Sequence, residues 1–106
     1  MQFIKILTVP EGALTVRGAW SEPRSVQSGS VCSGENALLI QSSGRFKRFS
    51  DAKEYLRIEE GGGYIKWKRG ELPFSAGDVF FADAPEEYDF YGAGKFLIVK
   101  AQEDKL

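Results

Sequence analysis

The chain has 106 residues, of which 42% are hydrophobic and 27% are charged, and these values are ordinary for one soluble globular domain. The 14 basic and 15 acidic residues leave a formal net charge of −1, so no overall positive field attracts nucleic acid or an anionic membrane. The basic clusters at 45–48 and 66–69 alternate with aromatic residues, as the solvent face of a strand does.

The N-terminal sequence and the cysteine content indicate the cellular compartment of the protein. Pro10-Glu11-Gly12 interrupts the first apolar run early, so this run is neither a secretory signal nor a membrane span. Cys32 is the only cysteine, which excludes a disulfide within the chain and gives no sign of an oxidising environment. We therefore expect a cytoplasmic protein that contacts neither nucleic acid nor membranes.

Short segments that alternate apolar and polar side chains, separated by glycine-containing turns, predict an all-β chain. In chain order, the expected strands are Phe3–Val9, Ala13–Trp20, Ala37–Ser42, Arg45–Phe49, Glu54–Glu59, Gly63–Lys68, Asp78–Asp83, Tyr88–Tyr91 and Lys95–Ala101. The polar segment Ser25–Glu35 is predicted to be a long loop, and Gly61-Gly62-Gly63 and Gly92-Ala93-Gly94 are predicted to be turns. Many short, evenly spaced strands are typical of an antiparallel sandwich or barrel.

The alternation also assigns side chains to the two faces of each strand. We expect an apolar inner wall formed by Leu56, Ile58, Ile65, Trp67, Val79, Phe81, Phe90 and Ile98. The polar side chains expected on this inner side are Gln41, Arg48, Glu54, Asp83 and Tyr88. Any chemistry inside the domain would have to use this short polar set.

The sequence contains no histidine, which excludes Ser-His-Asp and Cys-His catalysis. Zinc, iron and nickel sites rely on imidazole and thiolate ligands, and Glu54, Asp83 and Tyr88 are too few for a magnesium or calcium site. We therefore expect no metal and no other cofactor. The glycine runs also lack the residues of a phosphate-binding loop. Glu54 and Tyr88 remain, either as an acid–base pair or as hydrogen-bonded polar groups of the core.

The segment Gly77–Tyr88, GDVFFADAPEEY, resembles the second motif of the cupin superfamily, G-x5-P-x-G-x2-H-x3-N, in length and hydrophobic pattern. Asp83 and Pro85 replace the motif's proline and second glycine, and Tyr88 replaces its metal-binding histidine. The first motif ends in E-x6-G, which Glu54 and Gly61 match, but its two histidines are absent. The resemblance implies a single small cupin-like antiparallel jelly-roll β-barrel over 1–106, with N-terminal strands in 1–50 and the core motifs in 51–101.

About the last 55 residues are also similar to the C-terminal cupin half of type I mannose-6-phosphate isomerases. That half reads "EGEGTL…YPLKKGDSFFIPAG…EYTIEG…EFLVS" and likewise lacks metal-binding histidines. In those isomerases the zinc ligands and catalytic residues lie in the other, N-terminal part, and nothing in this chain matches that part. The resemblance therefore implies a fold rather than an activity.

Three interpretations of function remain open. The first is a metal-free module that binds a small polar ligand, a sugar or sugar phosphate, in the barrel mouth. Its expected contacts are Arg48, Glu54, Trp67, Asp83, Tyr88 and Phe90, with the Tyr88 hydroxyl in the mouth within reach of Glu54. The second is a structural or dimerisation barrel filled by its own side chains. The third is a sugar phosphate isomerase or epimerase that uses Glu54 and Tyr88 as candidate catalytic residues.

A homodimer is expected in each case. The runs Phe3–Val9 and Ala13–Trp20, if both are strands, leave an apolar sheet edge that needs a cover.

Overall fold

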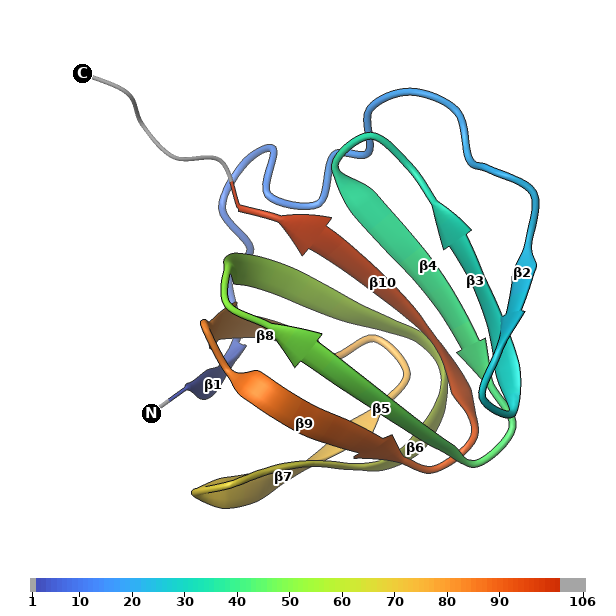
Figure 1. Cartoon of the computed structure of the whole chain (residues 1–106). Helices are drawn as coiled ribbons and strands as arrows, with labels where there is room; N and C mark the ends of the chain where they lie inside the picture. Colours follow the sequence, from blue (N-terminus) through green and yellow to red (C-terminus); the bar gives the residue numbers. More distant parts are fainter. Residues whose placement is uncertain (1, 102–106) are drawn as a thin grey trace.

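The computed structural model describes residues 2–101, and these residues form ten strands and no helix (Figure 1). The strands are β1 (Phe3–Ile6), β2 (Arg24–Val26), β3 (Gly29–Ser33), β4 (Ala37–Ser42), β5 (Arg45–Ser50), β6 (Lys53–Trp67), β7 (Gly70–Ser75), β8 (Val79–Asp83), β9 (Glu86–Tyr91) and β10 (Gly94–Lys100). All nine strand pairings are antiparallel, which confirms the predicted all-β, antiparallel class. None of residues 2–101 lies in a helix long and apolar enough to cross a membrane.

Strand β6 connects two sheets that enclose the core. The larger sheet has the order β1-β8-β6-β10-β4-β3-β2, and the smaller one contains β7, β6, β9 and β5. The first part of β6 pairs with β8 and β10, and its last residues, from Gly62 to Trp67, pair with β7 and β9. Figure 1 shows the resulting curvature, with the two sheets facing each other.

The glycine triplet 61–63 lies inside β6, so its prediction as a turn is wrong. Gly61 and Gly63 have φ values of 95° and 153°, and a Cβ at either position would collide with the backbone of the β9–β10 turn, at Ala93 and Tyr91 respectively. The pairing of β6 with β10 also shifts register between Lys95 and Phe96. The glycines therefore let one strand bend from the larger sheet into the smaller one while a neighbouring turn packs against it.

Two N-terminal predictions are also wrong. Ala13–Trp20 forms turns and extended chain instead of a strand. Its Leu14 and Val16 pack on the outer face of the larger sheet, against a cluster that contains Leu97. The alternation of apolar residues in this segment therefore comes from its packing against a sheet and not from a strand. Most of the predicted loop Ser25–Glu35 belongs to the hairpin β2–β3. In β3 only Val31 is buried, so this strand exists through its pairing with β4 and has little apolar signal of its own.

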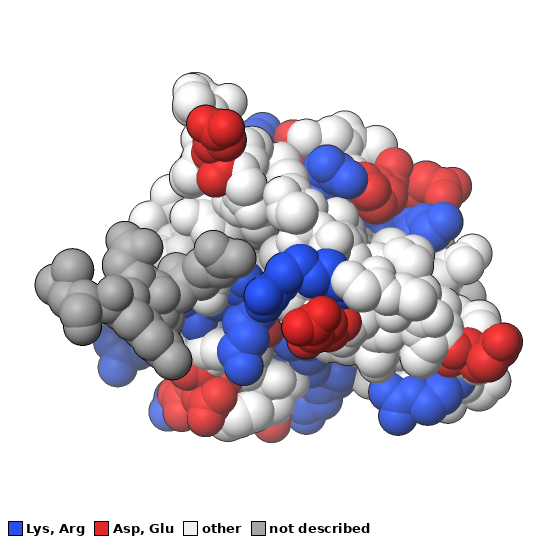
Figure 2. Space-filling model, turned by 90° about the horizontal axis from the view of Figure 1, so that it is seen from above, with Lys and Arg blue, Asp and Glu red and all other residues white. Residues whose placement is uncertain are grey.

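The core between the sheets is largely aromatic. Phe90 and Phe96 stack with ring centroids 4.1 Å apart, and Phe74 meets both rings edge-on. Six of the predicted inward residues belong to this core: Leu56, Ile58, Ile65, Trp67, Phe90 and Ile98. Figure 2 shows basic and acidic side chains interspersed over one face outside this core, with no broad region of either sign.

The side chains of β8 face the opposite sides of the sheet from those predicted. Phe80 lies opposite the buried Leu56 of β6, so Phe80 belongs to the core. Phe81 points to the outer face, as does Val79, which is nevertheless buried. Asp83 shares this outer face and is exposed. Apolar residues occupy both faces of β8, so alternation alone carried no information on which face is inner.

The predicted jelly-roll barrel is not closed by backbone hydrogen bonds. Strands β2 and β5 lie on different sheets and do not pair with each other. Instead, the Gln27 side chain crosses the gap: its Nε2 donates to the Lys47 carbonyl at 2.7 Å, and its Oε1 accepts from the Lys47 N–H at 2.8 Å. One amide side chain thus joins the two sheets at this place.

Candidate functional site

Three of the predicted inward polar residues form one buried network. Arg48 on β5 lies opposite Tyr88 on β9, and Glu54 stands near the start of β6. The terminal guanidinium nitrogens of Arg48, Nη1 and Nη2, donate to the two carboxylate oxygens of Glu54 at 2.6 and 2.7 Å, and Nη1 also donates to the Tyr88 hydroxyl at 2.9 Å. Glu54 is 5% exposed and Tyr88 is 1% exposed. The network therefore links the smaller sheet to the larger one through a two-pronged ion pair.

The electrostatics hold this network in one protonation state. Burial by itself lowers the pKa of the Arg48 guanidinium, but the hydrogen bond to Glu54 and the neighbouring groups raise the pKa above its ordinary value. Burial, assisted by the Glu54 charge, raises the pKa of Tyr88 to about 12 against the opposing effect of Arg48. At neutral pH the guanidinium is charged and the phenol keeps its proton. Such an arrangement suits a hydrogen-bonded polar core better than proton transfer.

Aromatic rings fill the space beside the network. The Phe3 ring lies 4.8 Å from the Trp67 ring and 4.9 Å from the Tyr88 ring, centroid to centroid. The Tyr88 ring lies 5.4 Å from that of Phe90, which is fully buried. The interior beside the network is therefore filled by side chains, and the fully buried Phe90 has no surface to offer a ligand.

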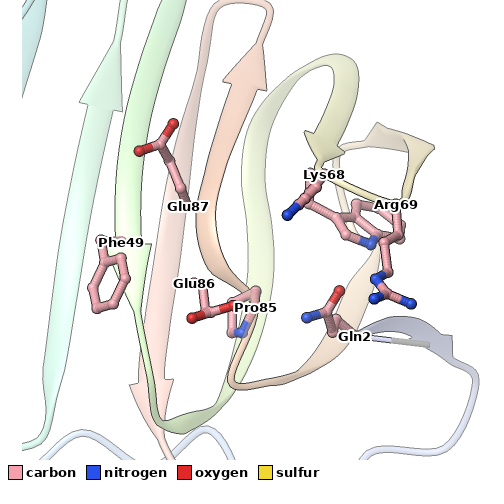
Figure 3. A pocket seen from close by; sticks show the side chains of 8 residues that line it. Gln2, Phe49, Lys68, Arg69, Pro85, Glu86 and Glu87 are labelled. Carbon is pink, nitrogen blue, oxygen red and sulfur yellow. The ribbon is translucent and has the colours of Figure 1, made fainter.

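An open cavity of about 610 Å³ lies at one end of the domain (Figure 3). It is lined by Gln2, Phe49, Trp67, Lys68, Arg69, Pro85, Glu86 and Glu87. Figure 3 places Lys68 and Arg69 on one side, with Gln2 beside Arg69, and Pro85 with Glu86 across from them. The cavity thus combines two aromatic side chains, two cations and two carboxylates.

Two turns build the walls of this cavity. Lys68 and Arg69 are the two residues between β6 and β7, and the next residue, Gly70, packs on the Trp67 indole, where a Cβ would lie 3.0 Å from Cζ2. On the other side, Ala84 and Glu86 have φ values of 45° and 63° around the buried Pro85. Non-glycine residues in this conformation cost about 1–3 kcal/mol each and are concentrated at functional sites.

A second cavity, of about 330 Å³, reaches the buried network from another side. Arg48 and Glu54 line it together with Asn36, Ser50 and Lys100, among others. Among residues 2–101, no group of three or more His, Cys, Asp or Glu side chains is placed to hold a metal ion.

Comparison with known proteins gives the fold a context. No family model and no curated protein matches the sequence. Among solved structures, mannose 6-phosphate isomerase from Bacillus subtilis superimposes with a TM-score of 0.65 at 16% identity, over 84% of this chain and 30% of that chain. The Salmonella typhimurium isomerase bound to fructose 6-phosphate and zinc gives 0.60 at 15% identity, over 76% and 22%.

A variant of Streptomyces PAC13 with uridine gives a TM-score of 0.66 at 12% identity, over 86% of this chain and 83% of that chain. The chain has a cupin-like fold. This finding confirms the resemblance seen in the sequence. The cupin-like chain spans less than a third of the isomerases' length but most of the length of PAC13.

Apart from Phe90, which is fully buried in the core, the predicted site residues of the cupin-like domain separate into three groups. Arg48, Glu54 and Tyr88 meet in one network, in which Arg48 joins the Tyr88 hydroxyl to Glu54. Trp67 lines the 610 Å³ cavity. Asp83 lies on the outer face of β8, which separates it from the rest because the predicted phase of that strand was wrong.

Sequence reasoning missed most of the cavity. Lys68 was assigned to the end of a strand, whereas it lies with Arg69 in the turn between β6 and β7. Two adjacent cations after Trp67 break the alternation, and this break was the available signal. Gln2 and Glu86 carried no signal, since they reach the cavity only through the folding of distant segments.

Proposed function

We propose that this cupin-like domain binds a small polar ligand, a sugar or sugar phosphate, in the 610 Å³ cavity. The observation that carries the proposal is the composition of this cavity, in which Trp67 stands beside Lys68, Arg69 and Glu86. None of the three charged side chains takes part in the five ion pairs formed among residues 2–101. An aromatic surface with a few available polar groups suits a hydroxylated ring, and the volume lies within the range of small-molecule sites, about 300–1,000 Å³.

The residues that line this cavity differ from the contacts expected from the sequence, of which only Trp67 is among them. The interior is occupied by Phe3, Tyr88 and Phe90, so the ligand lies at the open end, where Trp67 reaches the surface of the cavity. In this proposal the Arg48 network stands behind the site and fixes the strands that carry it. Two of the similar structures hold fructose 6-phosphate and uridine, both of which contain a sugar, and this agrees with the proposed class of ligand.

A thermal-shift screen tests the proposal. Sugars, sugar phosphates and nucleosides are added to the whole chain, and we expect at least one compound to raise the melting temperature. A ligand at about 100 times its dissociation constant adds about 2.7 kcal/mol to the free energy of unfolding. Glu86→Asn should weaken this shift without loss of fold, because asparagine tolerates the positive φ at this position.

Lys66→Gln is the matched control. Lys66 lies on the same strand as Trp67 but does not line the cavity. A screen in which no compound stabilises the protein would refute the proposal and favour the structural or dimerisation role, for which the filled interior is the supporting observation. An isomerase or epimerase role for Glu54 and Tyr88 has less support, since Arg48 already engages both.

A further inference from the structure

We infer that the ligand carries a phosphate group, which the β6–β7 turn binds through Lys68 and Arg69, and that its hydroxyl groups face Glu86. This inference rests on the proposed function, since it assigns a chemical class and an orientation to the ligand of the same cavity. It distinguishes a phosphorylated sugar from a neutral one.

The charges of the cavity are separated in space. Lys68 and Arg69 stand on the β6–β7 side, and Glu86 and Glu87 stand on the side of β9 (Figure 3). Glu87 is paired with Lys47 of β5 at 2.9 Å, so its charge is already neutralised. Two available cations therefore face one available carboxylate. A neutral sugar leaves both cations without a partner, whereas a phosphate at one end and hydroxyl groups at the other match both sides.

The two cations suit a phosphate in different ways. The planar guanidinium of Arg69 can donate two parallel hydrogen bonds to phosphate oxygens, and the ammonium group of Lys68 supplies a compact charge. Their backbone is held in place because Gly70 packs directly on the Trp67 ring. Trp67 itself is 6% exposed and contacts Phe3, so the turn rests on the core. A turn fixed in this way loses little freedom when it binds an anion.

On the opposite side, the backbone at Glu86 has an unusual conformation and its side chain is exposed. Glu86 follows the buried Pro85 and has a φ of 63°, which restricts where its side chain can lie. A carboxylate accepts hydrogen bonds from hydroxyl groups and repels a second anion. The cavity thus has one orientation that satisfies both ends of a sugar phosphate.

Fluorescence titration tests the inference. The chain has two tryptophans, so Trp20→Phe leaves Trp67 as the reporter inside the cavity. The probes are two matched pairs, fructose with fructose 6-phosphate and uridine with uridine 5′-monophosphate, together with inorganic phosphate. We expect one phosphorylated probe to bind about tenfold or more tightly than its neutral partner, the increment typical of a hydrogen bond between charged groups.

The variants locate the phosphate. Arg69→Gln and Lys68→Gln should each weaken binding of the phosphorylated probe about tenfold and leave its neutral partner unchanged, whereas Lys66→Gln should change neither. Glu86→Asn should weaken both members of the pair. Added salt should weaken only the phosphorylated probe.

The possible failures are distinguishable. Equal binding of both members of a pair, with no effect of Arg69→Gln, would overturn the phosphate assignment and leave the proposed function standing. Inorganic phosphate that binds as tightly as the phosphorylated sugar would overturn the orientation toward Glu86. Absence of binding by every probe, with no stabilising compound in the thermal screen, would refute the proposed function itself.

Discussion

The replacement of a metal-binding histidine by Tyr88 changes what one inward position does. In the cupin motif that this sequence resembles, the position supplies a metal ligand. Here the side chain still points inward, but its hydroxyl accepts a hydrogen bond from Arg48, whose guanidinium also holds Glu54. The cation that joins these groups therefore belongs to the chain itself. Removal of one partner would leave a buried charge without compensation, so the residues of this network depend on one another.

The raised pKa of Tyr88 predicts a pH dependence of stability. An unfolded tyrosine ionises near pH 10, whereas burial raises the pKa of Tyr88 to about 12. Between these values the folded chain keeps a proton that the unfolded chain has lost. The stability due to this proton is fully present below pH 10, and the free energy of unfolding should fall as pH rises from about 10 to about 12, by up to about 1.4 kcal/mol per pH unit.

Urea denaturation at several pH values measures this dependence. Tyr88→Phe cannot ionise, so it should remove this component of the slope, while a change of the half-exposed Tyr64 to phenylalanine should not. Parallel curves for Tyr88→Phe and the parent chain would show that Tyr88 is not the group responsible.

At the scale of strands, the Gln27 side chain forms hydrogen bonds with the free edge of β5, which no strand covers. It lies in the turn between β2 and β3 with a φ of 55°, and its amide pairs with both backbone groups of Lys47 on β5. A primary amide presents an N–H donor and a C=O acceptor side by side. The Gln27 side chain therefore makes the two backbone hydrogen bonds that a residue of a neighbouring strand would make. This contact joins the two sheets where the barrel is open.

Replacement of Gln27 by alanine should therefore weaken the link between the sheets. Two hydrogen bonds are lost at a solvent-accessible place, so we expect the free energy of unfolding to fall by about 1 kcal/mol. The amide proton of Lys47 should also exchange faster with solvent, since its acceptor is gone. Gln41→Ala, at an exposed position of β4, is the control. Unchanged exchange at Lys47 in the Gln27 variant would contradict the role assigned to this side chain.

At the scale of the whole molecule, the free edge of β1 is the place that most resembles an interface. No other strand of the part that the structure describes pairs with its second edge. Ile4, Leu7 and Val9 are 48%, 92% and 37% exposed in and after this strand. An open, apolar edge strand readily pairs with another chain.

We propose that β1 pairs with the same strand of a second copy to form a homodimer. Light scattering on the eluted protein should then give twice the 11.8 kDa mass of one chain. Ile4→Lys places a charge in the apolar strip and should shift the mass toward that of the monomer. A parent chain that elutes at the monomer mass at micromolar concentration would refute the dimer.

The sequence by itself determined the class of fold and the faces of the regular strands. Leu56 and Ile58 alternate with charged residues, as do Ile65 and Trp67, and all four lie in the core as predicted. The inward positions of Arg48, Glu54 and Tyr88 were likewise predictable. Alternation follows from the geometry of one strand, in which successive side chains point to opposite faces, so it needs no knowledge of partners.

Only the tertiary structure decided the features that depend on contacts between distant segments of the chain. The face of β8 follows from the pairing of Phe80 with Leu56, and the glycine bend of β6 follows from the turn that packs against it. The cavity belongs to the same class of features: the Asp83 N–H donates to the Gln2 carbonyl at 2.8 Å, which brings the N-terminus beside the turn that precedes Glu86. Strand pairing and packing join residues distant in the sequence, and a local pattern contains no record of them.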